Sequence, residues 1–415
     1  MSRNKKILII TSSFPAYKNS SVGGGNFVLK LSEKISATVE PIVLAPQFRN
    51  SPKQEKIGNV RIFRFNYLPA KKLYNHFEYG IFHGFNHKLL LKPFIISYFI
   101  SAFMNSMKLI KKYDIPLVHA HWIVPQGLIA LLLKFICARR RKVIVTSHGG
   151  DMFSVQNGIG FILKKIILNK ADAVTVVSNY IKNVMVNNLG IKRKIYIASM
   201  GIDTKMFKPE NNSQYIRERY NIKGHFLLFV GRLVEKKGVK YVLRAMPEII
   251  HHYPDTKLLI VGTGPEKNNL QKLAKELNLN ENVIFTGYVQ YSDLPPYFAT
   301  ADLFIGPSVI AKDGNSEGFG LVFAEAASSG CPVIATNFPA VKDIIIHNKT
   351  GFIVPAMNSN AVRETVLSVF QRKNMLPDII TEARNHIKRN FDWDIVAQRY
   401  TNIYKMCESD QFGIS

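Results

Sequence analysis

The chain has 415 residues, of which 47% are hydrophobic and 20% charged, and these ordinary globular proportions exclude wholesale disorder. Its three cysteines are far apart and lack a C-x-x-C spacing, so neither a disulfide framework nor a cysteine zinc site is expected, and a reducing compartment fits best. Lysine and arginine number 55 against 29 aspartates and glutamates, a net charge of +26, and residues 1–200 hold 30 of the basic but only 7 of the acidic side chains.

Short apolar runs, typical of buried strands, alternate with helical patterns along the whole chain. In the first half these runs are 6–10, 41–45, 60–65, 117–120, 143–147, 173–177 and 194–197. In the second half they are 226–230, 257–261, 283–286, 303–305, 333–335 and 352–354. This alternation, which occurs twice over, predicts an α/β protein with two doubly wound, Rossmann-like domains.

The boundary between the two domains is expected within residues 199–209, where turn residues coincide with the change in charge. The first domain is then 1–200 and the second 201–390, and the final helix, 391–408, is a candidate to pack back on the first domain. Ligands of open parallel sheets bind beyond the carboxyl ends of the strands, so two facing domains would enclose an interdomain cleft. The basic first half predicts an anionic partner, which is a phosphorylated ligand, an acidic membrane surface or nucleic acid.

Neither a signal peptide nor a membrane span is expected. The apolar run behind the basic start, residues 7–10, is too short for a signal peptide. The most apolar window, residues 89–104, is interrupted by Lys92 and Pro93 and falls short of the ~20 residues that a span needs. Two interpretations of this window stay open: a helix buried in the first domain, or a surface helix that dips into a bilayer with the help of flanking lysines.

Two loops that follow strands of the first domain carry candidate site residues. Gly23, Gly24 and Gly25 precede a helical pattern and would let backbone amides approach a phosphate, although they do not form G-x-G-x-x-G and a flexible loop is the alternative. His148 stands at the end of the 143–147 strand, where it could donate a hydrogen bond or carry a proton. A structural histidine is the alternative there.

The second domain opens with a strand, a turn and a helix, with Arg232 at the end of the strand and Lys237 at the start of the helix. Two fixed cations beside the positive end of a helix favour a clamp for a diphosphate over a solvated basic turn.

Glu317 and Glu325 flank a glycine-rich helix start. Eight residues of helix rise about 12 Å, whereas a retaining glycosidase holds its two carboxyls about 5–5.5 Å apart. The two residues are therefore expected to grip different parts of one long ligand, with the helix-start amides at its anionic middle. An exposed cap for Glu317 and a salt-bridged helix residue for Glu325 are the alternatives.

Together these segments resemble the retaining glycosyltransferases of family four, which have the GT-B fold. The resemblance rests on Gly231-Arg232 with Lys237-Gly238, followed by Glu317-Gly-Phe-Gly-Leu and Glu325. The Gly23-Gly24-Gly25 loop, Ser147-His148-Gly149 and Phe391-Asp-Trp393 occupy the matching places elsewhere, so the resemblance covers essentially the whole chain.

The resemblance implies a role for each matching position. In the second domain, Arg232 and Lys237 would neutralise the diphosphate, and Glu325 would hold the ribose. Glu317 and the amides near Phe319, Gly320 and Leu321 would hold the sugar. The nucleobase would lie near Tyr288 and Val289. In the first domain, Gly24 and Gly25 would let the chain close on the phosphates, and His148 would lie near the sugar C6 and the reacting centre.

No metal and no cofactor is expected besides the donor itself. His119 and His121 share one face of a strand, but no third ligand can be assigned to them. The family generally works without a bound metal, and Asp392-Trp-Asp394 stands where it would cap the last helix rather than bind a metal. The charged pair Lys312-Asp313 and residues 50–112 match no family signal, so the acceptor is not specified.

The leading hypothesis is an enzyme that moves a hexose, with retention, from a nucleotide diphosphate sugar to a lipid-linked or saccharide acceptor. It would act in the cytoplasm as a peripheral protein on the inner face of the cell membrane, in the assembly of a bacterial surface polysaccharide or glycoconjugate. A nucleotide-sugar 2-epimerase of the same architecture and a non-enzymatic nucleic-acid binder are the alternatives, although no nucleic-acid recognition module is visible. The donor, the linkage and the oligomeric state are not specified by the sequence.

Overall fold

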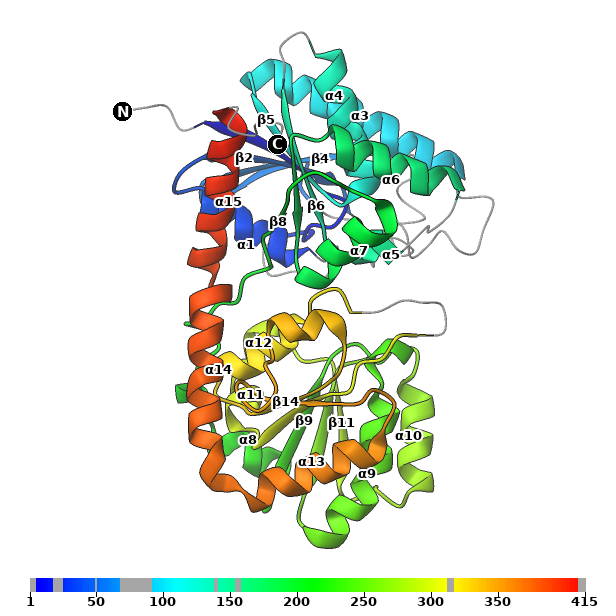
Figure 1. The fold of residues 1–415 in the computed structure, drawn as a ribbon, viewed down its shortest axis with the longest axis vertical. Coiled ribbons are helices and arrows are strands. Elements are labelled where there is room, and N and C mark those ends of the chain that lie inside the picture. The colour runs from blue at the N-terminus through cyan, green and yellow to red at the C-terminus, as the bar shows by residue number, and fades with distance from the viewer. Residues whose placement is uncertain are drawn as a thin grey trace. The chain divides into compact units, whose positions relative to one another are not determined.

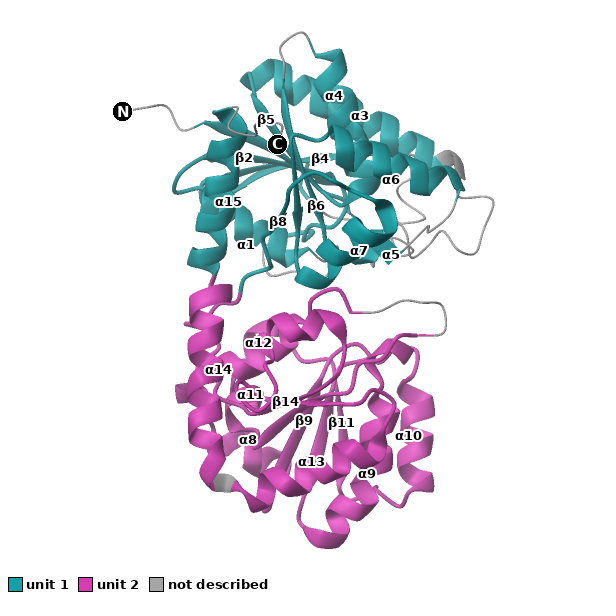
Figure 2. Ribbon diagram, in the orientation of Figure 1, with its two compact units in different colours: residues 1–201, 393–415 teal, residues 202–392 magenta. Residues whose placement is uncertain are grey.

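The computed structural model describes residues 5–17, 25–48, 51–67, 92–137, 141–153, 158–311 and 317–409. The chain divides into two compact units (Figure 2): unit 1 is residues 1–201 with 393–415, and unit 2 is residues 202–392. Each unit has its own parallel sheet with helices packed on it, which confirms the predicted α/β class with two doubly wound domains.

Unit 1 contains an eight-stranded sheet in the order β3-β4-β2-β1-β5-β6-β7-β8. Only the pairing of β3 with β4 is antiparallel among these strands. The strands are β1 (Lys6–Ile10), β2 (Glu40–Pro46), β3 (Gln54–Ile57), β4 (Val60–Phe65), β5 (Leu117–His121), β6 (Lys142–Ser147), β7 (Ala173–Val176) and β8 (Ile195–Ile197). The edge strand β3 was not predicted, because it has almost no buried side chains and lacks an apolar run.

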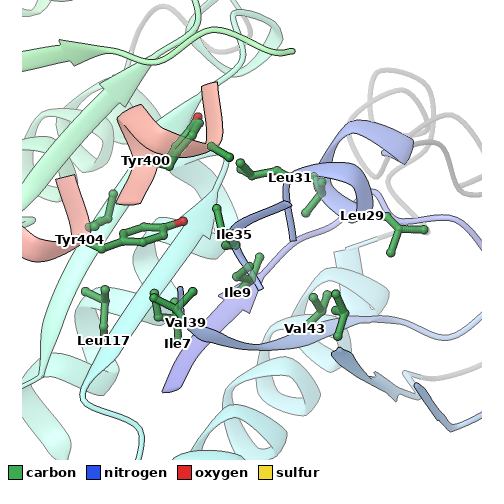
Figure 3. Close-up of a cluster of buried hydrophobic side chains, with 14 of the residues drawn as sticks. Ile7, Ile9, Leu29, Leu31, Ile35, Val39, Val43, Leu117, Tyr400 and Tyr404 are labelled. Carbon is green, nitrogen blue, oxygen red and sulfur yellow. The ribbon is translucent and has the colours of Figure 1, made fainter. Parts of the chain in front are cut away.

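Helices cover both faces of this sheet (Figure 1). The main ones are α1 (Asn26–Ile35), α3 (Lys92–Tyr113), α4 (Leu128–Ile136), α5 (Gly150–Phe153), α6 (Gly158–Lys170), α7 (Asn179–Leu189) and α15 (Trp393–Glu408). Helices α1 and α15 pack together against one face, where Tyr400 and Tyr404 of α15 join a core with Ile7 and Ile9 of β1 (Figure 3). The C-terminal helix α15 is therefore a structural part of unit 1.

The last helix begins two residues later than predicted, because residue 391 ends the preceding helix. Helix α14 (Leu376–Phe391) belongs to unit 2, and Asp392, which is not helical, separates it from α15 in unit 1. Within unit 2, the amide of Ile202 donates to the carbonyl of Phe391 at 2.7 Å. Within unit 1, a Cβ on Gly201 would lie 2.4 Å from the ring of Trp393, so only glycine allows this approach. The chain passes from one unit to the other at 201–202 and again at 392–393, and these two segments are therefore neighbours.

Helix α3 has features of both interpretations given to the apolar window. Tyr98, Ala102 and Leu109 are buried, so one face of the helix belongs to the core of unit 1. The other face exposes Ile96 and Ile100, which are 61% and 55% accessible. Within the described residues, no helix has the length and the apolar character needed to cross a membrane.

Unit 2 contains a six-stranded parallel sheet in the order β11-β10-β9-β12-β13-β14. Its strands are β9 (Phe226–Val230), β10 (Lys257–Val261), β11 (Val283–Gly287), β12 (Leu303–Gly306), β13 (Val333–Thr336) and β14 (Phe352–Val354). Helices α9 (Val239–His252), α10 (Lys267–Glu276) and α13 (Ser359–Gln371) share one apolar core with these strands. The remaining helices are α8 (Gln214–Arg219), α11 (Pro295–Thr300), α12 (Leu321–Ser328) and α14.

Candidate functional site

The loops that follow β9, β10 and β12 lie side by side, because these three strands are neighbours in the parallel sheet of unit 2. Backbone hydrogen bonds join the loops to one another. The amide of Leu233 donates to the carbonyl of Thr263 at 2.9 Å, and the amide of Val309 donates to the carbonyl of Lys236 at 2.8 Å. The predicted strand-end residues of the second domain therefore stand on one interlocked surface.

Gly238 is required by the path of the β9 loop. Its φ of +63° lies in the left-handed region, and a Cβ there would stand 2.0 Å from the carbonyl oxygen of Pro307. Glycine thus lets the β9 loop pack directly on the β12 loop. The residue before it, Lys237, is held at the start of α9 by this contact.

Lys237 and Glu317 form a short ion pair in this surface. The ammonium of Lys237 lies 2.6 Å from Oε2 of Glu317, and the two side chains are only 15% and 16% exposed. Burial by itself favours the neutral acid, but the ammonium groups of Lys237 and Lys236 outweigh it and lower the pKa of Glu317. Glu317 is therefore an ionised, paired carboxylate and not the exposed cap that was the alternative.

The start of α12 lies directly after Glu317. Gly320 adopts φ +89° at the N-cap of the helix, and a Cβ there would meet the ring of Phe323 at 2.6 Å. The side chain of Phe319 is buried against Phe391, with ring centroids 5.5 Å apart. Phe319 can therefore offer a ligand only its backbone, while the amides from Leu321 onward carry the partial positive charge of a helix start.

Glu325 lies further along α12 and is also buried. Burial raises its pKa to about 7, although a hydrogen bond from Tyr291 and the charge of Lys237 act in the opposite direction. Tyr291 follows β11 and was not predicted as a site residue, because a tyrosine in a polar loop has no distinguishing pattern. It connects Glu325 to the same strand-end surface.

The remaining predicted residues of unit 2 occupy the edge of this surface. Arg232 is exposed in the β9 loop, three residues before the short turn Glu235–Lys237 that precedes α9. Tyr288, which is 61% exposed, and the half-buried Val289 directly follow β11. The amide of Gly262 donates to the carbonyl of Gly287 at 2.8 Å, so these residues border the β10 loop.

His148 stands at the end of β6 in unit 1, within an aromatic surrounding. Its Nε2 is 2.9 Å from Nδ1 of His121, which ends the neighbouring strand β5. The rings of Phe27 and Trp122 each lie 4.8 Å from its ring. Burial lowers the pKa of His148 well below 6.5, with a further contribution from His121. The imidazole is therefore neutral at physiological pH.

Asp151, which was not assigned a role from the sequence, holds the turn that presents His148. Its buried carboxylate accepts hydrogen bonds from the amides of Ile123, His148 and Gly149 and from the hydroxyl of Ser147, at 2.8–3.2 Å. Burial raises the pKa of Asp151 in spite of these donors. A single carboxylate thus joins the strand-end loops of β5 and β6.

Gly25 forms the N-cap of α1 and places Phe27 beside His148. Its φ is +67°, and a Cβ there would lie 2.0 Å from the carbonyl oxygen of Ser13. Gly25 is thus required by a close approach to the loop after β1. Gly23 and Gly24 lie outside the described residues, as does the Lys312-Asp313 pair.

His119 and His121 have separate partners. The two nitrogens of His119 lie 2.9 Å from the hydroxyl of Tyr404 and 2.7 Å from that of Thr146, whereas His121 contacts His148. The part of the chain that the structure describes contains no group of three or more potential ligands arranged to hold a metal ion.

Two family models match the chain, one on each half. The model described as Glycosyltransferase Family 4 matches residues 22–206, and the model described as Glycosyl transferases group 1 matches residues 213–386. Each model therefore covers most of one sheet and its strand-end loops.

Curated relatives and solved structures agree with these models. A GDP-mannose-dependent alpha-(1-6)-phosphatidylinositol monomannoside mannosyltransferase from Mycolicibacterium smegmatis is 29% identical, over 69% of this chain and 75% of its own. An N-acetyl-alpha-D-glucosaminyl L-malate synthase from Bacillus anthracis is 25% identical, over 71% and 75%.

The whole fold is similar to that of solved glycosyltransferases. Sucrose-phosphate synthase from Thermosynechococcus elongatus superimposes with a TM-score of 0.76 at 21% identity, over 98% of this chain and 100% of its own. HepE from Anabaena in complex with UDP gives a TM-score of 0.72 at 17% identity, over 96% and 99%. The curated relatives favour the transferase hypothesis over the 2-epimerase and the nucleic-acid binder. The chain belongs to the glycosyltransferases of group 1 and family 4.

Proposed function

We propose that this protein transfers a hexose from a nucleoside diphosphate sugar to a lipid-linked or saccharide acceptor. The observation that carries the proposal is the buried pair of Lys237 and Glu317 at the start of α12, with Glu325 further along the same helix. This arrangement offers a cation, two carboxylates and helix-start amides to one ligand. The relatives support the donor class, since the mycobacterial enzyme is named for GDP-mannose and HepE was solved with UDP.

Each group then has a distinct task. Lys237 and the exposed Arg232 offset the charge of the diphosphate, together with the amides at the start of α12. Glu317 accepts hydrogen bonds from the sugar while it keeps Lys237 in place, and Glu325 accepts the ribose hydroxyls. Tyr288 and Val289 border the nucleobase. In unit 1, His148 donates a hydrogen bond to a sugar hydroxyl, and Gly25 lets the start of α1 approach a phosphate.

The reaction is proposed to be retaining and metal-independent. The diphosphate leaves with negative charge, and fixed cations with aligned amides can stabilise that charge without an ion. Retention requires that the acceptor attack the face from which the diphosphate departs. The anomeric configuration of the product, measured by NMR, tests retention, and unchanged activity in EDTA tests metal independence.

The variants K237A and E317A test the assignment of the donor site. Each is expected to lose at least about 100-fold in transfer activity, since each removes one buried member of an ion pair that touches the donor. K272A is the matched control, because it removes a lysine from an exposed pair with Glu276 at 3.9 Å. Full activity in both site variants, with folding intact, would contradict the assignment.

A thermal-shift panel identifies the donor. GDP, UDP and ADP and their hexose forms, beginning with GDP-mannose, are added to the purified protein. The true donor raises the apparent melting temperature because it binds only the native state. The increase is expected to vanish in K237A. If no nucleotide diphosphate stabilises the wild type, the proposed donor class is wrong.

We further propose that the protein works as a peripheral protein at the anionic cytoplasmic face of a membrane, in the assembly of a surface glycoconjugate. The basic excess of residues 1–200 supports this, as do the apolar faces of two helices of unit 1. Ile159, Ile162 and Ile166 share one face of α6 and are 86%, 58% and 46% exposed. Ile96 and Ile100 form a similar stripe on α3.

Vesicle sedimentation tests the membrane proposal. Vesicles with phosphatidylglycerol are expected to bind the protein more strongly than phosphatidylcholine alone, and salt should weaken the binding. I159E/I162E should reduce binding, whereas V186E, which alters an exposed apolar side chain on α7, should not. Equal binding to both kinds of vesicle would contradict the role of charge.

A further inference from the structure

Arg64 stands where the alternation of β4 calls for one more apolar residue. Val60 and Ile62 are fully buried and belong to the core that the sheet of unit 1 shares with α1. Arg64 follows at the same two-residue spacing, so it lies on the same face of the sheet. Its side chain is 0% exposed. A buried charge costs free energy unless it is paired and hydrogen-bonded, so the partners of Arg64 indicate what it does.

The guanidinium of Arg64 joins three segments of unit 1. Its Nη2 donates to the carbonyl of Pro15 at 3.0 Å, and its Nη1 donates to the carbonyl of Pro52 at 3.1 Å. Nη2 also lies 2.5 Å from Oε1 of Glu55 on β3. Pro15 belongs to the β1 loop, residues 11–17, and Pro52 precedes β3. The planar fork of donors thus holds the β1 loop to the paired strands β3 and β4.

The β1 loop is also the surface against which α1 begins. The hydroxyl of Thr11 donates to the carbonyl of Ser13 at 2.8 Å. The same carbonyl oxygen lies so close to Gly25, the N-cap of α1, that a Cβ there would be 2.0 Å away. The β1 loop therefore contacts Arg64 through Pro15 and the start of α1 through Ser13. The amides at that start carry partial positive charge.

Filling the core would not require an arginine at this position. Well-packed apolar residues often replace a buried ion pair without loss of stability, and the rest of this face of β4 is apolar. An apolar side chain could not donate to a loop carbonyl, however. Arg61 on the same strand differs, since its exposed pair with Glu40 at 3.1 Å joins the neighbouring strands β4 and β2. Arg64 is thus suited to fix a loop.

We propose that Arg64 is a positioning residue that fixes the β1 loop through Pro15, and thereby holds the start of α1 where it approaches a phosphate of the donor. The inference rests on the proposed function of Gly25. Arg64 is buried, so it acts through the loop and does not touch the substrate. Glu55 supplies the countercharge that keeps the guanidinium in place.

Hydrogen exchange measured by mass spectrometry tests the contact without an activity assay. R64M keeps a long side chain but loses every donor, so the amides of residues 11–17 should exchange about 10-fold faster or more. R61M is the matched control, because it makes the same change at an arginine that is 44% exposed. Exchange in the β1 loop that is unchanged in R64M, or equally fast in R61M, overturns the proposal.

A conservative variant covers the case in which R64M does not fold. R64K retains a charge and can reach one of the two carbonyls, so exchange in the β1 loop should be intermediate between the wild type and R64M. If R64K exchanges as slowly as the wild type in this loop, the paired donors of the guanidinium are not needed and the proposal fails.

Kinetics connect the β1 loop to the donor. In R64M, the KM for the donor and the inhibition constant of inorganic pyrophosphate should both rise about 10-fold, because both depend on the same phosphate contact. R64K should recover part of both losses. V60A leaves a cavity on the same face of β4, so it should lower the melting temperature and leave pyrophosphate inhibition unchanged. If V60A weakens that inhibition as much as R64M, the effect is general loosening and the proposal is wrong.

The outcomes separate this inference from the proposed function. Faster exchange in R64M with unchanged pyrophosphate inhibition would refute the link to the phosphate, while the transferase assignment stands. If the wild type transfers no sugar, the proposed function fails, but the exchange experiment still decides whether Arg64 fixes the β1 loop.

Discussion

In this protein, the net charge of each half of the chain does not match the charges at the candidate site of the corresponding unit. Residues 1–200 carry +23 of the net charge of +26 (30 basic less 7 acidic side chains), yet the candidate site of unit 1 contains neutral histidines and aromatic rings. The second half is close to electrically balanced, yet the site of unit 2 contains a buried ion pair and a second buried carboxylate. Net charge therefore does not identify the part of the chain that holds the charged ligand.

The difference indicates two separate uses of charge. At the site of unit 2, Lys237 and Glu317 form a largely buried ion pair, which suits the proposed recognition of a diphosphate and its sugar. In unit 1 many of the described lysines and arginines are exposed, where their charge can act at long range on an anionic surface. The chemistry near His148 is then left to groups that stay uncharged.

The largest effect is expected from G238A, which would break the docking of the β9 loop on the β12 loop. The new Cβ would lie 2.0 Å from the carbonyl oxygen of Pro307, and the positive φ adds roughly 1–2 kcal/mol of strain. We expect loss of donor binding, measured by thermal shift, and a clear fall in stability. G58A is the control, since its φ is +56° and a Cβ there meets nothing within 4 Å. Equal effects of both variants would show that backbone strain alone is responsible.

The second largest effect is expected from D151N. This variant tests whether the turn that presents His148 depends on the buried carboxylate of Asp151. The amide places an NH2 group against backbone N–H donors that the carboxylate now accepts. We expect a loss of about 2–4 kcal/mol in the free energy of unfolding and a lower kcat. Chemical denaturation and steady-state kinetics measure the two. If D151N matches the wild type in both, Asp151 does not hold the turn of His148.

The sequence allowed the sheets to be predicted far better than the contacts at their ends. Every predicted strand is present with ends that differ by at most one residue, because continuous apolar runs are a strong signal for buried parallel strands. Strand β3 was missed because it is an exposed edge strand, which pairs with β4 through a tight turn at Gly58. Its stability comes from backbone pairing, which leaves no hydrophobic pattern.

The site residues divide in the same way. Lys237 and Glu317 could be predicted from their motifs, although their contact joins loops 80 residues apart in the sequence. The contact of His121 with His148 could not, because it depends on β5 and β6 being neighbours in the sheet, and strand order is not visible in the sequence. Tyr291 was missed for a related reason. Its hydrogen bond to Glu325 joins two separate strand-end loops, and such a contact leaves no pattern in the sequence.

A smaller, pH-dependent effect on the free energy of unfolding is expected from E325Q. This variant tests whether Glu325 is a buried carboxylate of the unit 2 site. The pKa of Glu325 is raised to about 7, so the native state holds this proton more tightly than the unfolded chain does. The stability from this group is complete below about pH 4.5 and is lost as the pH rises through 7, by up to about 3 kcal/mol. E325Q cannot ionise, so its stability relative to the wild type should increase between pH 5 and pH 8. A constant difference across that range would mean that the carboxylate is not destabilised by burial.

The smallest effect is expected from Y288A at the exposed edge of the unit 2 site. Tyr288 is 61% exposed and directly follows β11, so it can stack on a nucleobase from one side only. Stacking on an aromatic side chain contributes about 1–3 kcal/mol per base, and exposure places this residue at the low end. We expect the KM for the donor to rise a few-fold with kcat unchanged, and Y288F to behave as the wild type. A fall in kcat with constant KM would instead place Tyr288 near the reacting centre, and the division of unit 2 into a base-binding edge and a charged interior would have to be redrawn.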